Sequence, residues 1–196
     1  MSERPFDPDD DAEIPLDPDE RRQLVPTYIS TRPQLNEAEQ IGVTEADDWA
    51  FRRRRNVLDE RFLLNLHRRM FGKVWKWAGT LRTTERNIGV EAYRIGVELR
   101  ASLDDARYWI AKATFSSDEI AVRFHHRLVW IHPFPNGNGR HARLSADLLA
   151  VSLGRPRFTW GNASLVEAVA TRAQYVAALK AADAHDMAPL LAFARS

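Results

Sequence analysis

Residues 131–144 of the 196-residue chain read IHPFPNGNGRHARL, a stretch that predicts two helices joined by a tight turn. Its two prolines exclude helix between them, because proline lacks a backbone N–H. The glycines of the Gly-Asn-Gly step allow positive φ and let a ligand approach the backbone closely. We therefore predict one helix that ends near Ile131 and a second helix from about Asn138 to Leu153.

The start of the second helix is suited to bind an anion, because its unpaired N–H groups and positive dipole end face the turn. Arg140 and Arg143 lie three residues apart, on one face of that helix. Two guanidiniums there favour a diphosphate or triphosphate over a single carboxylate. A neutral imidazole on His132, at the end of the preceding helix, could accept a proton from an attacking hydroxyl. Each feature alone also occurs in plain turns and caps, but their combination predicts phosphate chemistry.

The rest of the chain has mostly helical periodicity, which predicts an all-α fold class. Residues 81–97 are rich in Thr, Ile, Val, Gly and Asn, a composition that predicts a loop with one small β-hairpin. The remaining predicted helices are Pro33–Gly42, Thr44–Phe71 with at most one break, Leu99–Ala113, Ser116–Ile131, Leu165–Asp183 and Ala188–Ala194.

The amino-acid composition excludes several classes of function. The chain has no cysteine, which excludes disulfides, thiolate metal sites and a cysteine nucleophile. No apolar run approaches the roughly 20 residues of a membrane helix, and the acidic N-terminus does not resemble a signal peptide. These features predict a cytoplasmic protein.

Charge divides the chain into two parts. Residues 1–20 hold nine acidic residues and one arginine, a net charge of −8, so residues 21–196 carry +9. Six of the ten prolines fall within the first 33 positions. Such a segment buries too little apolar surface to offset its ordering entropy. We predict an acidic, disordered or loosely draped arm over residues 1–30 and a helical domain over 31–196. The arm either confers solubility or folds against the basic body and competes with an anionic ligand.

The motif from His132 to Arg143 resembles the signature of Fic-domain proteins: a His, a Phe, an acidic residue, Gly-Asn-Gly-Arg and a second Arg three residues later. The match extends over about residues 48–194 and includes Trp77-Ala-Gly79 and the helix from Arg123 to Ile131. Three further segments resemble the Fic subgroup called mobile mystery protein B. They are Asn36-Glu-Ala-Glu39, Asn87-Ile-Gly-Val90 and Phe158-Thr-Trp-Gly161.

The resemblance implies a Fic-type helical bundle and a protein adenylyltransferase (AMPylator), which moves a nucleotide monophosphate from ATP to a hydroxyl of a target protein. It implies that His132 is the general base and that Phe134 anchors the loop in the core. Residues implied to bind the nucleotide phosphates are Gly137, Asn138, Gly139, Arg140 and Arg143, the last at the γ-phosphate. Residues implied to form a flap that docks the target main chain are Thr83, Thr84, Asn87, Ile88 and Gly89.

Two departures from the Fic pattern concern the metal and the control of the enzyme. Asn136 stands where the family has an Asp or Glu that holds Mg²⁺, and a neutral amide oxygen predicts a weakly held ion. The chain could therefore be a Fic scaffold that binds nucleotide but transfers it weakly or differently. The inhibitory segment of many Fic proteins has its frame in residues 31–36, with Leu35 in place of the glutamate. Glu37 or Glu39 could substitute, and otherwise control falls to a separate regulator or antitoxin.

A basic nucleic-acid-binding module is the alternative from another class. The +9 body and the run of arginines from Arg52 to Arg55 favour it. The sequence has no helix-turn-helix, RRM or zinc signature, and an arginine run of this kind also forms an ordinary solvated helix face. We therefore expect the target protein and ATP as partners, with neither a membrane nor a nucleic acid.

Overall fold

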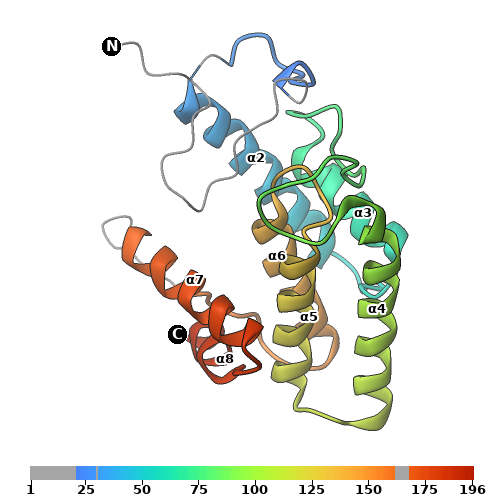
Figure 1. Cartoon of the computed structure of the whole chain (residues 1–196). Helices are drawn as coiled ribbons and strands as arrows, with labels where there is room; N and C mark the ends of the chain where they lie inside the picture. The colour runs from blue at the N-terminus through green and yellow to red at the C-terminus, as the bar shows by residue number, and fades with distance from the viewer. Residues whose placement is uncertain (1–20, 30, 162–167) are drawn as a thin grey trace.

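The computed structural model describes residues 21–29, 31–161 and 168–196, and within these it confirms an all-α fold (Figure 1). Seven α-helices and one short 3₁₀ helix follow one another in the described part of the chain. They are α2 (Arg32–Phe51), α3 (Glu60–Phe71), η1 (Ala92–Arg94), α4 (Ile95–Lys112), α5 (Ser117–Ile131), α6 (Asn138–Ser152), α7 (Ala168–Asp183) and α8 (Ala188–Arg195). Most of the predicted arm and the first residues of the predicted helix from Leu165 lie outside the described residues.

Several helix ends follow from local sequence signals. The side chain of Thr31 accepts a hydrogen bond from the Gln34 backbone, and the Gln34 side chain returns one to Thr31, which forms a capping box. The hydroxyl of Ser116 caps α5 by accepting from the Glu119 N–H, and Gly72 ends α3. These three predicted boundaries are confirmed.

The predicted helix from Thr44 to Phe71 contains the one break that the sequence allowed. The predicted end of the preceding helix at Gly42 is wrong, because α2 runs through this residue. Helix α2 runs on to Phe51, and α3 begins only at Glu60, where the Asp59 carboxylate accepts from the Phe62 N–H at 2.9 Å. The arginine run is therefore not a helix face, because it forms the end of α2 and the connection that follows. The guanidinium of Arg55 donates to the Trp49 carbonyl at 2.9 Å, which satisfies a carbonyl at the helix end.

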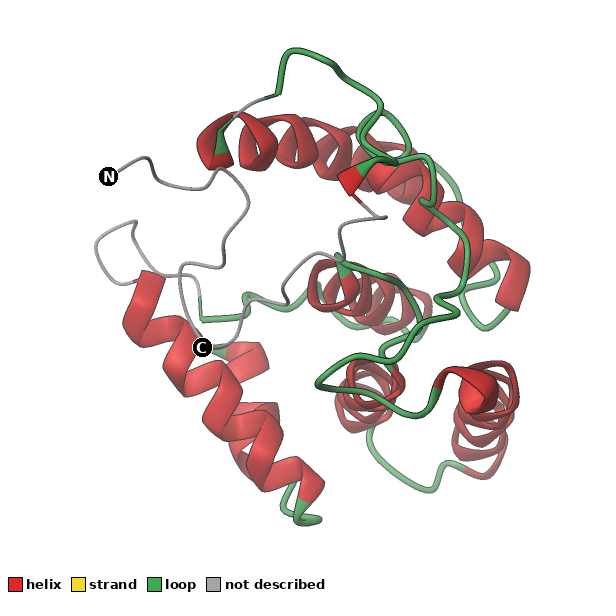
Figure 2. Ribbon diagram, turned by 45° about the horizontal axis from the view of Figure 1, so that its top comes forward, coloured by secondary structure: helices red, strands yellow, loops and turns green. Residues whose placement is uncertain are grey.

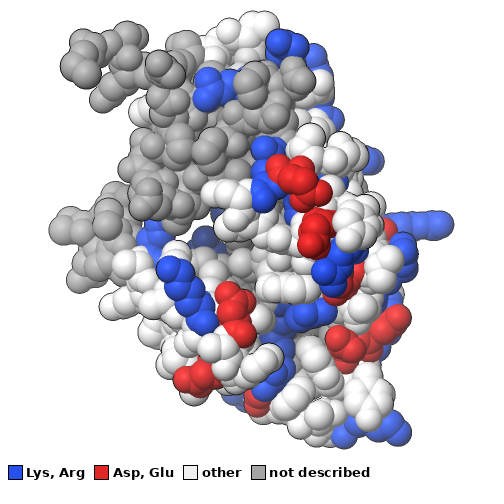
Figure 3. All heavy atoms as spheres, viewed as in Figure 1, with Lys and Arg blue, Asp and Glu red and all other residues white. Residues whose placement is uncertain are grey.

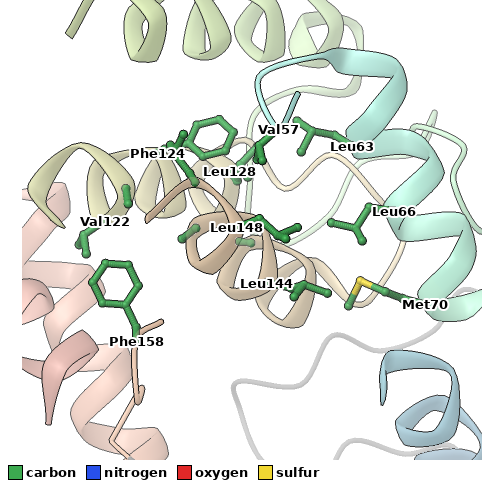
Figure 4. Packing of buried hydrophobic residues seen from close by; sticks show 14 of the residues in the cluster. Val57, Leu63, Leu66, Met70, Val122, Phe124, Leu128, Leu144, Leu148 and Phe158 are labelled. Atoms are coloured by element: carbon green, nitrogen blue, oxygen red, sulfur yellow. The ribbon is translucent and has the colours of Figure 1, made fainter. Parts of the chain in front are cut away.

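The core lies between α3, α5 and α6. Figure 4 shows Leu66 and Met70 of α3 pointing toward Leu144 and Leu148 of α6, and all four side chains are at least 93% buried. Helix α5 packs against both α4 and α6, while α7 and α8 form a separate pair that reaches the core through α5. This packing holds the turn between α5 and α6 rigidly at one end of the bundle.

No helix in the described part of the chain is long and apolar enough to cross a membrane. On the face seen in Figure 3, basic side chains lie next to acidic ones and do not form a continuous basic stripe.

Candidate active site

The turn between α5 and α6 is closed by Asn138. Its side-chain oxygen accepts from the Phe134 N–H at 2.9 Å, and its amide nitrogen donates to the Phe134 carbonyl at 2.8 Å. Asn138 is 3% exposed, so its side chain shapes the turn and is not available to a ligand. Gly137 has a φ of 76°, and a Cβ there would lie 2.5 Å from the Phe71 ring, which requires glycine at this position.

The buried imidazole of His67 supports the turn from α3. Its Nδ1 accepts from the Gly79 N–H at 3.0 Å, and this contact fixes the tautomer in which Nε2–H donates to the Asn136 carbonyl at 3.0 Å. The ring stacks on Phe134 with centroids 3.7 Å apart. Burial holds the pKa of His67 well below its ordinary value, so the ring stays neutral and keeps both contacts. Phe134 is 1% exposed, as expected of an anchor.

His132 ends α5 in a left-handed conformation, with a φ of 53°. The following proline disfavours right-handed helix at this residue, which turns the chain sharply toward α6. His132 is 6% exposed, and neither ring nitrogen has a partner within hydrogen-bond geometry among the described residues. Burial lowers the pKa of His132 to about 4. The Val129 backbone acts to raise this pKa, while the positive charges of Arg82 and Arg86 lower it further. The imidazole is therefore neutral and has a free nitrogen lone pair at neutral pH.

The start of α6 presents backbone N–H groups and the guanidinium of Arg143. Gly137 provides no side-chain cap, so the first-turn N–H groups are not covered by one. Arg143 lies over the Tyr175 ring at 5.2 Å and forms no ion pair with a carboxylate in residues 21–29, 31–161 or 168–196. The Tyr175 hydroxyl in turn contacts Nε2 of His125 at 3.0 Å. This end of α6 suits a polyanion.

Arg140 already has an anionic partner. Its guanidinium pairs with Glu39 of α2 at 2.5 Å, and the second oxygen of Glu39 accepts from the Trp75 indole at 2.6 Å. The Glu39 side chain is 4% exposed. Glu39 therefore pairs with the first arginine of the motif, Arg140, and not with Arg143. Leu35 packs into the core at 3% exposure.

Asn136 uses its side-chain oxygen within the turn. That oxygen accepts from the Gly137 N–H at 2.6 Å, which leaves one lone pair and no negative charge for a cation. Among the residues that the structure describes, no three His, Asp or Glu side chains come together as a metal site.

The predicted β-hairpin within residues 81–97 is wrong in secondary structure. Residues 80–91 form a loop, and Figure 2 shows no strand in the described chain; the one isolated bridge joins Leu24 and Trp75. Thr83, Thr84, Asn87, Ile88 and Gly89 are all exposed. A Cβ on Gly89 would lie 2.5 Å from the His132 Cβ, so the loop touches the candidate base. The loop forms no hairpin because the carbonyls of Thr84 and Val90 accept from the Arg82 guanidinium and not from an opposite strand.

Sequence reasoning missed Arg82 and His67 and left the role of Glu39 open. All three are polar side chains that are at least 97% buried and contact the motif or its turn. For Glu39 and His67, the only feature of the local sequence that indicates a buried role is a polar residue on an apolar helix face. Arg82 lies in a loop, where the local sequence gives no such indication.

Known proteins resemble this chain over a region that includes the turn between α5 and α6. The family model described as Fic/DOC family matches residues 57–150, which include the flap and the motif. The protein adenylyltransferases fic-1 of Caenorhabditis briggsae and Caenorhabditis elegans are each 33% identical to the chain over 135 residues. These residues make up 67% of this chain and 25% of the relatives, so the chain spans about a quarter of the length of those proteins.

Solved structures share the fold. Fic-1 (residues 134–508) from C. elegans superposes with a TM-score of 0.67 at 26% identity, over 88% of this chain and 50% of that one. The BepC protein of Bartonella tribocorum, solved with bound AMPPNP, has a TM-score of 0.68 at 17% identity, over 90% and 95% of the two chains. The latter likeness concerns the fold alone, and the subgroup resemblance stays a prediction. From the motif, the fold and these matches together, we conclude that the chain belongs to the Fic/DOC family.

Proposed function

We propose that this protein is an adenylyltransferase that moves AMP from ATP to a Ser, Thr or Tyr hydroxyl of a target protein. The observation that carries the proposal is the turn from His132 to Arg143. One tight turn separates a buried, neutral imidazole from the start of α6, which has no side-chain cap, and from a guanidinium that pairs with no carboxylate of the described residues. The adenylyltransferase names of the C. elegans and C. briggsae relatives support the same reaction.

His132 acts as the general base of the transfer. The target hydroxyl gives its proton to the imidazole, its oxygen bonds to the α-phosphorus, and the bond from that phosphorus to the bridging oxygen breaks to release pyrophosphate. A pKa of about 4 leaves the imidazole deprotonated before substrate binds. The negative charge of a bound triphosphate then favours the imidazolium and raises this pKa toward a value better matched to proton transfer.

The start of α6 binds the phosphates. Backbone N–H groups of Gly137, Asn138 and Gly139 are the proposed donors to the α- and β-phosphates, where charge develops during transfer. The Gly137 N–H exchanges its hydrogen bond to the Asn136 side chain for one to a phosphate oxygen when the nucleotide binds. Arg140 also binds these phosphates. A guanidinium has five N–H groups, and those that do not pair with Glu39 can donate to phosphate oxygens. Arg143 is the partner of the γ-phosphate.

Thr83, Thr84, Asn87, Ile88 and Gly89 are the proposed docking site for the target main chain. They are exposed and adjoin His132 through Gly89, so an extended segment bound along them brings its hydroxyl to the imidazole. Peptide main chains commonly bind in this way through backbone hydrogen bonds.

Magnesium fits this chain poorly. Mg²⁺ prefers one or two carboxylates together with substrate phosphates, whereas Asn136 supplies one neutral oxygen that is already hydrogen-bonded. The nearest carboxylate to Arg140, that of Glu39, is committed to an ion pair. We infer that any Mg²⁺ arrives with the nucleotide phosphates, with Asn136 as a weak ligand, and we assign no step of the reaction to it.

Incubation with labelled ATP, GTP, CTP and UTP, followed by intact-mass measurement of the protein and of lysate proteins, tests the function. An added nucleotide monophosphate that is absent with His132→Ala supports it. Nucleotide binding with no added mass under any condition would leave the binding scaffold as the better description. Salt-sensitive oligonucleotide binding without nucleotide transfer would favour the nucleic-acid module. A cytoplasmic location and control by a separate regulator or antitoxin remain part of the proposal.

A further inference from the structure

The guanidinium of Arg82 is buried beneath the flap, and within the described chain its hydrogen bonds go to backbone carbonyls and not to a carboxylate. Its side chain has no exposed surface, and the Glu85 carboxylate lies 4.0 Å away in solvent. Nε donates to the His132 carbonyl at 2.7 Å, and Nη1 donates to the Thr84 carbonyl at 3.0 Å. Nη2 donates to the Val90 carbonyl and, at 3.4 Å, to the Ile131 carbonyl. One side chain therefore joins both sides of the flap to the end of α5.

The backbone around His132 depends on this segment. Carbonyls at the end of a helix have no partner within the helix, and a left-handed residue other than glycine is strained. Besides the guanidinium contacts, the Val90 N–H donates to the Ile131 carbonyl at 3.3 Å, and the Arg82 N–H donates to the Pro133 carbonyl at 2.9 Å. Three consecutive carbonyls, 131 to 133, thus accept hydrogen bonds from the flap and its base.

We propose that Arg82 is a positioning residue, which holds His132 in its left-handed turn and fixes the flap, and with it the target hydroxyl, in register with the imidazole. The inference rests on the proposed transfer reaction and adds to it a residue that touches neither nucleotide nor target. Arg82 also places a positive charge near the imidazole of His132. Burial is the main reason that the protonated imidazolium is disfavoured, and the charges of Arg82 and Arg86 add to this effect.

The variants Arg82→Gln and Arg82→Lys test the role, with Arg94→Gln as the matched control. Arg94 follows the flap and is partly exposed, with side-chain pairs to Glu91 and Glu98 and none to the motif. Four properties are measured for each variant: fold by circular dichroism, ATP affinity by calorimetry, transfer rate at saturating ATP, and the titration of His132 by NMR of labelled imidazole.

Displacing a reacting group by about 1 Å costs on the order of a hundredfold in rate. We therefore expect Arg82→Gln to lose roughly tenfold to a hundredfold of transfer rate, with ATP affinity within a few-fold, because the phosphate donors lie on α6. The pKa of His132 should rise and its backbone amide signal should move. Arg82→Lys, with a flexible ammonium in place of the planar fork, should fall between Gln and wild type. Arg94→Gln should match wild type.

A folded Arg82→Gln protein with wild-type rate and an unchanged His132 titration would overturn the inference, and so would equal losses in Arg94→Gln. If Arg82→Gln does not fold, Arg82→Lys decides by the same measurements, and a full rate there overturns the role. If the wild type transfers nothing, the proposed reaction fails, while the NMR titration and amide shift still decide whether Arg82 holds His132.

Discussion

Replacing His141 with Gln should make the protein less sensitive to acid. His141 lies within the motif on the core side of α6 and is 1% exposed. Its Nε2–H donates to the Leu63 carbonyl at 3.0 Å, and its ring meets Phe134 edge-on. Burial lowers its pKa from 6.5 to about 4. A glutamine amide can donate to the same carbonyl but cannot take up a proton.

The direction of this pKa change determines whether the protein gains or loses stability as the pH falls. Between pH 6.5 and about 4 the unfolded chain binds a proton at His141 and the folded chain does not. The stabilising contribution of the neutral ring is therefore fully present above pH 6.5 and is lost as the pH falls toward 4. The whole difference amounts to about 3 kcal/mol, and about 2 kcal/mol of it is lost by about pH 5. Burial lowers the pKa of His67, His125 and His132 as well, so the wild type should lose stability more steeply than one proton requires.

Urea unfolding of wild type and His141→Gln at several pH values between about 7.5 and 5 measures this contribution. The free energy of unfolding of the variant should fall with pH less steeply, by up to about 1.4 kcal/mol per pH unit. His185→Asn, which removes an exposed histidine, controls for the loss of an imidazole as such. Equal pH slopes for wild type and His141→Gln would refute the reasoning, whatever the stability of the variant at neutral pH.

Four further predictions concern the site. His132→Ala should abolish transfer, by roughly 10²- to 10⁴-fold, and leave ATP affinity within a few-fold; equal activity would remove the imidazole from the chemistry. Arg143→Ala should weaken ATP binding more than AMP binding, and equal losses by calorimetry would place its role in structure. Asn136→Asp should lower the Mg²⁺ concentration for half-maximal transfer, since Asp can still accept from the Gly137 N–H and adds a charge; slower transfer at every Mg²⁺ concentration would contradict this. Glu39→Gln should tighten ATP binding, because it removes a buried negative charge beside Arg140, and weaker binding would show that Glu39 orients that arginine.

Local sequence alone determined the turn, most helix ends and the chemistry expected at the turn. The prolines between His132 and Arg140 restrict the backbone and the glycines allow its positive φ. The caps at Thr31 and Ser116 use hydrogen bonds within three residues. Such signals survive in any tertiary context, because donor and acceptor are close along the chain. The all-α class follows from the same kind of information, since helical periodicity is a property of contiguous residues.

Only the tertiary structure decided how the flap folds and which residues support the motif. The Arg82 guanidinium reaches carbonyls 49 and 50 residues away, and Glu39 reaches Arg140 across 101 residues. The composition of the flap predicted strands, but carbonyls of the flap accept hydrogen bonds from the buried Arg82 side chain and not from a neighbouring strand. Contacts of this kind depend on which helix faces meet, and helix faces are set by packing of the whole core. For that reason the motif residues could be read from the sequence, whereas the side chains that hold them in place could not.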